Sequence, residues 1–157
     1  MSKPKIGTIA AVSTPAGRSA ISLIRISGPD TFKILKKLFI TGGKKAFPLP
    51  YSVYFGSVIE PETGLVADKC LVTTFTAPRS YTGEDLAEVS THGNPLVVSR
   101  VLQLLLKHGA VAAEAGEFTR RAFLNGKMDL LEVEAVSQLL SANTSSQARL
   151  ALKQLDG

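Results

Sequence analysis

Cysteine, histidine and long apolar runs are scarce in this 157-residue chain, and each shortage argues against a class of protein. A single cysteine, Cys70, rules out a disulfide within the chain or a cysteine cluster, and it predicts a reducing cytoplasmic location. Two histidines, His92 and His108, offer little material for zinc, so we expect no metal site. No run of about 18 apolar residues exists to span a membrane. Residues 1–20 lack the order of a signal peptide.

A glycine-rich phosphate loop is also missing. The nearest string, TGGKKAF (41–47), lacks the first glycine and the final hydroxyl of the G-x-x-x-x-G-K-[ST] pattern. We therefore expect these residues to bind no GTP.

The chain does have a 45% hydrophobic content and a net charge of +5. This apolar content is enough for one compact domain with an appendage. Part of the positive charge is crowded into residues 33–45, at Lys33, Lys36, Lys37, Lys44 and Lys45. A phosphate backbone is one partner for such a cluster. A solvated helix face followed by a flexible loop at 41–50 is the favoured interpretation, because no aromatic platform or known binding motif accompanies the lysines.

The spacing of apolar residues predicts an α/β (α+β) fold, with a mixed β-sheet and flanking helices. Strands are expected at 6–12, 20–28, 51–59, 69–77 and 86–92, with a hairpin turn at Glu62–Gly64. Helices are expected at 31–39, 96–109 and 116–124, with His108 as a polar cap. A single amphipathic helix is expected from Asp129 towards Leu155, with an apolar side that needs a partner surface.

A lysine lies in the short joint between the last two of these helices. In GEFTRRAFLNGKMDLLEVEA (116–135), Asn125-Gly126 is a left-handed stop, and Asp129 with Glu132 is a capping box. Lys127 is left between them. It is either a solvated charge at a helix end or a ligand contact held from both sides.

Two charged residues lie within strands that are otherwise apolar. By strand parity Arg25 shares a face with Ile21 and Leu23, and Glu88 shares one with Leu86 and Ser90. A charge on a half-buried strand needs a counter-ion or a ligand. The two therefore form a structural ion pair, or they bind a ligand.

Other polar residues give weaker signals. Glu84 and Asp85 fall in a loop, where we expect them to be solvated. His92 has no paired nucleophile or acid at a readable spacing, so a structural or solvent-facing histidine is favoured over a general base.

Three blocks carry a resemblance to a known family. TIAAVSTPAGRSAISLIRISG, SYTGEDLAEVSTHGN and GEFTRRAFLNGKMDLLEVEAV resemble, in the same order, the N-terminal region of the tRNA modification GTPase family MnmE, also called TrmE. The resemblance covers nearly the whole chain. It implies a folate-binding and dimerisation domain at 1–120, resembling the folate-binding aminomethyltransferase domain. The truncated start of a helical domain follows at 121–157.

The resemblance also implies a function. Family members are homodimers that bind 5-formyltetrahydrofolate or methylenetetrahydrofolate. With the FAD protein MnmG they add an aminomethyl or carboxymethylaminomethyl group to the wobble uridine of tRNA. Their folate contacts correspond to Arg25, Glu88 and Lys127 here, and no catalytic residue is implied. GTP, potassium and magnesium belong to a domain absent from these residues.

Two features limit what the resemblance implies. THGN (91–94) departs from the more usual HGG ending, and the GTP-binding domain is missing. The alternatives are a free-standing folate-dependent aminomethyltransferase-like protein and a dimerisation scaffold without ligand. We expect no GTP hydrolysis by these residues alone.

Overall fold

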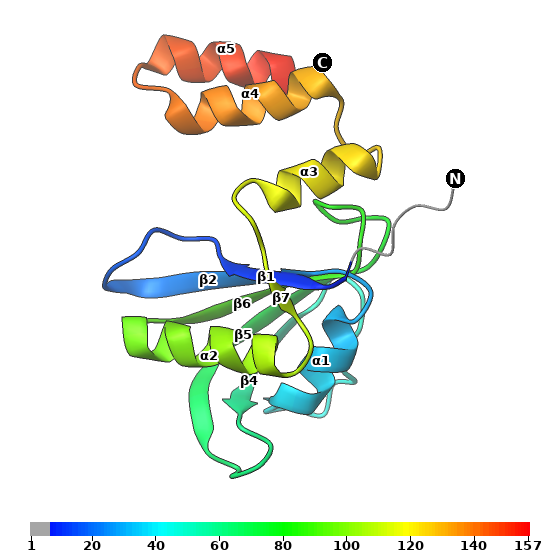
Figure 1. Ribbon diagram of the computed structural model, residues 1–157, viewed down its shortest axis with the longest axis vertical. Coiled ribbons are helices and arrows are strands. Elements are labelled where there is room, and N and C mark those ends of the chain that lie inside the picture. Colours follow the sequence, from blue (N-terminus) through cyan, green and yellow to red (C-terminus); the bar gives the residue numbers. More distant parts are fainter. Residues whose placement is uncertain (1–6) are drawn as a thin grey trace. The chain divides into compact units, whose positions relative to one another are not determined.

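The computed structural model describes residues 7–157, which form two compact units (Figure 1). The sheet unit contains the residues up to Ser80 together with Glu84–Glu114. The helical unit contains Tyr81–Gly83 and Ala115–Gly157. The expected domain boundary after residue 120 stays a prediction.

The sheet unit is built on one mixed sheet of seven strands within the described residues, in the order β3-β4-β5-β6-β2-β1-β7. Neighbouring strands are antiparallel, except that β1 and β7 are parallel. The strands are β1 (Ile9–Val12), β2 (Ser19–Ser27), β3 (Phe39–Thr41), β4 (Val53–Ile59), β5 (Val66–Phe75), β6 (Leu86–Gly93) and β7 (Val111–Ala112). The mixed α+β fold expected from the sequence is confirmed.

Two helices, α1 (Thr31–Leu38) and α2 (Pro95–Lys107), cover one face of this sheet (Figure 1). Successive residues of a strand point to opposite faces of the sheet, so every second side chain points towards these two helices. The fully buried core includes Ile24 and Ile26 of β2, Val89 of β6, and Leu35 and Leu105 of the two helices. The opposite face, called here the second face, carries Arg25 and Glu88.

The predicted strands of the sheet unit are confirmed, with ends moved by a few residues. Ile6, at the start of the first predicted strand, lies outside the described residues. The hairpin between β4 and β5 is confirmed, with Gly64 N–H donating to Glu60 O at 2.8 Å. His108 is the C-cap residue of α2, as expected. The edge strands β3 and β7 were missed, since two or three residues are too short for a readable alternation.

The helical unit contains α3 (Glu117–Leu124), α4 (Leu130–Ser141) and α5 (Ser145–Leu155). The prediction of a single helix from Asp129 towards Leu155 is wrong. The chain turns at Ala142–Thr144, and α4 and α5 lie side by side (Figure 1). Thr144 starts α5 through a capping box with Gln147. No helix among residues 7–157 combines the length and apolar character needed to cross a bilayer.

Candidate functional site

Arg25 and Glu88 lie directly opposite each other on β2 and β6, two central neighbours of the sheet. Arg25 Nη2 donates to Glu88 Oε1 at 2.9 Å, and Arg25 Nε donates to the same oxygen at 3.3 Å. Their side chains keep 22% and 24% of their exposure, so water still reaches the pair. The register therefore produces one of the two predicted arrangements, an ion pair, on the second face of the sheet.

The other oxygen of Glu88 is not used in this pairing. Within the described residues, Oε2 accepts no hydrogen bond from a protein donor. A carboxylate has lone pairs on both oxygens and can accept from two donors side by side. Glu88 can therefore stay paired with Arg25 through Oε1 and still accept a donor group of a ligand through Oε2.

Glu84 and Asp85 are less solvated than the sequence suggested, and that expectation is wrong. Ser27 Oγ, fully buried at the end of β2, donates to Glu84 Oε2 at 2.7 Å. Asp85 Oδ1 accepts from the backbone N–H of Ala77 at 3.0 Å. Both carboxylates are half-buried. Glu84 satisfies a polar group at the end of β2, and Asp85 satisfies one just after β5. The Ser27–Glu84 bond was not predicted because the two residues are 57 positions apart and a serine hydroxyl gives no charge signal in the sequence.

Lys127 lies in the helical unit, in the short joint that the sequence predicted. Gly126 adopts φ +71° after α3, and the backbone N–H of Lys127 donates to Ala122 O at 2.8 Å. On the other side, Asp129 and Glu132 form the predicted capping box that opens α4. The backbone of Lys127 is thus held from both sides, while its side chain is exposed.

The joint also contacts the second sequence block, at Tyr81–Gly83. Asn125 Nδ2 donates to Thr82 O at 2.8 Å, and Thr82 is fully buried. A Cβ atom added at Gly83 would lie 3.0 Å from Lys127 Cγ, so the lysine stem passes directly over this glycine. The structure therefore brings Arg25 and Glu88 together in the sheet unit, and it places Lys127 on a supported joint in the helical unit.

His92 is a solvent-facing histidine, as expected, and a carboxylate that was not predicted holds it. Its Nδ1 lies 2.8 Å from Asp68 Oδ1, and its backbone N–H donates to Asp68 Oδ2 at 2.9 Å. The imidazole keeps 71% of its exposure. Asp68 was not predicted as its partner. The residue lies on β5, and the pairing of strands that brings it to His92 cannot be read from a local sequence pattern.

Three further groups in the sheet unit have shifted pKa values. Burial, and then Asp68, raise the pKa of the Cys70 thiol to about 12. A hydrogen bond from Thr63, together with Arg100, lowers the pKa of Glu60. A backbone hydrogen bond and Lys107 lower the pKa of Glu62. The two glutamates attach the β4–β5 hairpin to α2 and lie away from the Arg25–Glu88 pair.

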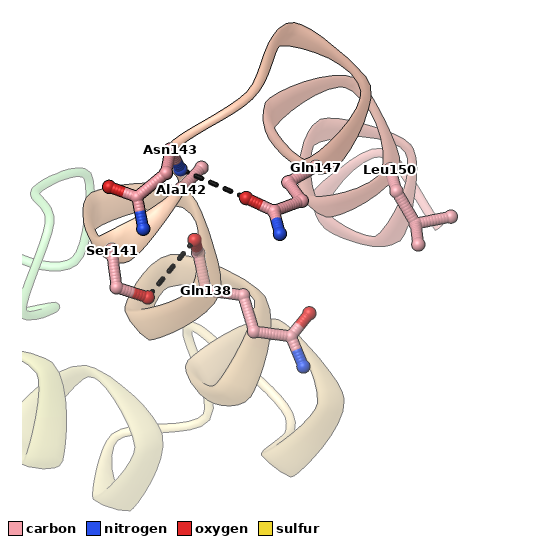
Figure 2. Close-up of a pocket in the computed structure, with 6 residues that line it drawn as sticks. All are labelled: Gln138, Ser141, Ala142, Asn143, Gln147 and Leu150. Carbon is pink, nitrogen blue, oxygen red and sulfur yellow. Dashed lines mark hydrogen bonds between the residues drawn. The ribbon is translucent and has the colours of Figure 1, made fainter.

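A hollow of about 240 Å³ in the helical unit has no reactive group (Figure 2). It is lined by amides, hydroxyls and apolar groups at the α4–α5 turn. Gln147 Oε1 accepts from the backbone N–H of Asn143 at 2.9 Å, and Ser141 Oγ donates to Gln138 O at 3.3 Å (Figure 2). These polar groups close the turn, so the hollow follows from helix capping.

Comparison with known proteins decides the family. The sequence model described as "GTP-binding protein TrmE N-terminus" matches residues 8–127, a span that contains Arg25, Glu88 and Lys127. The chain belongs to the TrmE family. It is similar to proteins named "tRNA modification GTPase MnmE": 45% identical over 150 residues in Levilactobacillus brevis, 44% over 151 in Enterococcus faecalis and 43% over 152 in Carboxydothermus hydrogenoformans.

These matches cover 96% of the chain but only 32–33% of each relative. The chain thus spans about a third of the length of these tRNA modification GTPases and corresponds to the N-terminal region of the TrmE family.

Proposed function

We propose that the chain is the tetrahydrofolate-binding and dimerisation module of a tRNA modification GTPase. The observation that carries the folate proposal is the free oxygen of Glu88 beside a paired Arg25. Family membership adds support, because the matched span includes all three expected contact residues.

These residues fit a reduced folate. The pterin ring presents adjacent N–H donors, which suit a carboxylate acceptor such as Glu88 Oε2. Folate also carries carbonyl oxygens along its middle and carboxylates at its far end, and Arg25 and Lys127 are cations suited to such acceptors. Bound 5-formyltetrahydrofolate or methylenetetrahydrofolate would supply the one-carbon unit. The role of the three side chains is to bind and orient it.

The larger reaction lies beyond this chain. We propose that the whole protein works in the cytoplasm with an FAD protein of the MnmG type. Together they would add an aminomethyl or carboxymethylaminomethyl group to the wobble uridine of tRNA. GTP, potassium and magnesium would act in a GTP-binding domain outside these residues. Relatives named tRNA modification GTPases, about three times longer than this chain, support the proposal.

Homodimerisation is the second part of the proposal. The helical unit exposes large apolar side chains, including Leu130 at 69%, Leu140 at 83% and Leu150 at 60%. Exposed apolar groups gathered in one region are typical of protein interfaces. Most homo-oligomers associate through a two-fold interface, so we expect a dimer. Sedimentation at micromolar concentration measures it, and a pure monomer would contradict this part.

Calorimetric titration with 5-formyltetrahydrofolate tests the ligand site. Glu88→Gln keeps the size of the side chain but replaces an acceptor with an amide. We expect binding to weaken by on the order of 1.5–3 kcal/mol, the value of a hydrogen bond to a charged group. Lys127→Ala should also weaken binding without unfolding the chain, because the Lys127 side chain is exposed.

Matched controls separate the site from general effects. Glu60→Gln breaks another Glu–Arg pair of the sheet unit, in which Arg100 Nη2 lies 2.7 Å from Glu60 Oε2. Lys153→Ala removes an exposed lysine from α5. Both controls should bind folate as the wild type does. If Glu88→Gln and Lys127→Ala are folded and bind with unchanged affinity, these residues do not belong to a folate site.

A further inference from the structure

We propose that the exposed side of α1 and the loop after β3 form an RNA-backbone-binding surface, the lysine patch. Its members are Lys33, Lys36, Lys37, Lys44 and Lys45. The inference rests on the tRNA partner of the proposed function, and it assigns that partner a surface on this chain.

The net charge of the chain is concentrated in this patch. Removing these five lysines from the 18 basic residues leaves 13, equal to the number of acidic residues. Between Asp30 and Glu60 the sequence contains no Asp or Glu. In the described part of the chain, none of the five lysines forms an ion pair with a carboxylate. A surface with this balance attracts polyanions.

The helix presents three of the lysines together. α1 buries Thr31, Ile34, Leu35 and Leu38 against the sheet unit. Lys33, Lys36 and Lys37 are exposed on the remaining sides, with spacings of three and four residues that make helical neighbours. The apolar side of α1 is fully used in the core, so only its charged side is available to a partner.

Aromatic packing anchors the loop that carries Lys44 and Lys45 to Phe39, the residue that follows α1. Phe47 of the loop packs against Phe39 and Tyr54, with ring centroids 5.4 and 4.9 Å apart. Tyr54 OH donates to Ala46 O and accepts from the backbone N–H of Leu49, both at 2.6 Å. Lys45 Nζ lies 5.0 Å from the Tyr54 ring centroid. The expected flexible segment at 41–50 is therefore an exposed loop anchored through Ala46, Phe47 and Leu49.

An exposed aromatic side chain, Phe55, lies near one of the loop lysines, Lys45, although the sequence did not indicate it. Because Tyr54 points into the core beneath α1, its neighbour Phe55 points to the second face of the sheet. A hollow of about 280 Å³ is lined by Lys45, the backbone around Gly42 and Gly43, and Phe55. Phe55 keeps 61% of its exposure, and its ring edge would lie 3.6 Å from a Cβ added at Gly42. Exposed aromatic rings next to cations stack with unpaired bases while the cations hold phosphates.

RNA fits this arrangement better than a membrane surface does. A helix that binds at a lipid interface inserts an apolar face, and the apolar face of α1 is already buried in the core. The proposal therefore commits to a folded RNA with a single-stranded loop. Anionic vesicles serve as the competing ligand in the test.

Fluorescence anisotropy with end-labelled unfractionated tRNA measures the binding. Lys33→Gln/Lys37→Gln removes two charges, four residues apart, from α1. Arg149→Gln/Lys153→Gln removes two exposed charges with the same spacing from α5 and is the matched control. Each phosphate contact contributes about 0.7–0.9 to the slope of log affinity against log salt. We expect the α1 variant to lower that slope by about 1.4–1.8 and to bind at least about tenfold more weakly.

Phe55→Ser tests the stacking contact. It should weaken binding to a labelled single-stranded oligonucleotide by about five- to hundredfold, the value of one stacked base, and leave binding to a duplex unchanged. Equal losses in the α1 and α5 variants would overturn the proposal. Binding to anionic vesicles but not to tRNA would also overturn it.

Folate titration of the same variants separates this inference from the proposed function. Absent tRNA binding with intact folate binding would refute the lysine patch alone. Absent folate binding by the wild type, with tRNA binding that still depends on the lysines, would refute the folate site and leave the patch.

Discussion

The Arg25–Glu88 pair should stabilise the free protein, and its removal should be strongly non-additive. Arg25→Met leaves Glu88 without its cation on a central strand. Glu88→Met does the reverse and leaves the arginine without its carboxylate. The double variant replaces both charges of the pair with apolar groups. Breaking one half of a buried pair is costly, whereas replacing both halves is often close to neutral.

The structure sets the size of the effect. Two unit charges about 4 Å apart attract by about 4 kcal/mol at the effective dielectric constant of a protein surface. Exposed fractions of 22% and 24% let water screen part of that attraction. We therefore expect a coupling of about 1–2 kcal/mol, above the 0.2–1 kcal/mol of a typical exposed pair and below the cost of breaking a fully buried one.

Urea unfolding of the four proteins at pH 7 measures the coupling. The chain has no tryptophan, so far-UV circular dichroism is the signal. The Arg100–Glu60 pair is the comparison, and it should couple less because Arg100 keeps 45% of its exposure. At about 1 M salt the screening length falls to about 3 Å, which should reduce the comparison pair more. A coupling below about 0.3 kcal/mol would refute the reasoning.

Two further outcomes are expected from the structure and one from the sequence. Cys70, with a pKa of about 12, has only about one thiolate in ten thousand at pH 8, so iodoacetamide should label it only in urea; rapid labelling of the folded chain would contradict this. Glu60 and Glu62 have lowered pKa values, so their pairs with Arg100 and Lys107 should stabilise the hairpin above pH 4.5 and weaken as the pH falls below it. Carboxyl NMR titration measures this, and ordinary pKa values would be the contrary result. A fluorescent GTP analogue should show no saturable binding to the 157 residues, since the phosphate-loop pattern is missing.

Most of the fold was predicted from the spacing of apolar residues along the chain. Strand parity placed Arg25 and Glu88 on half-buried faces, and the structure confirms both faces. Strand parity did not predict that the two residues face each other, because they are 63 positions apart and their register depends on the whole sheet. Ser27–Glu84 and His92–Asp68 were missed for the same reason.

The sequence contains a start signal for α5, but a longer apolar pattern continues across it. Leu140 and Leu150 prolong an apolar pattern across it, and that pattern favoured one helix. Thr144 and Gln147 nevertheless have the spacing of a capping box, which is a start signal. The capping box decides where α5 begins, although the apolar pattern continues across this point. It does so because it satisfies backbone N–H groups that have no partner in the first turn of a helix.

The sequence block at 80–94 and the block at 116–136 are linked through Gly83. This residue has φ +77°, a conformation that side chains other than glycine rarely adopt. A methyl group there would also press against the stem of Lys127 and the Cβ of Asn125. The glycine of SYTGED and the lysine of LNGK thus depend on each other for space. The position of Lys127 is therefore set by two distant parts of the chain, and this explains why a short joint can hold an exposed lysine in one place.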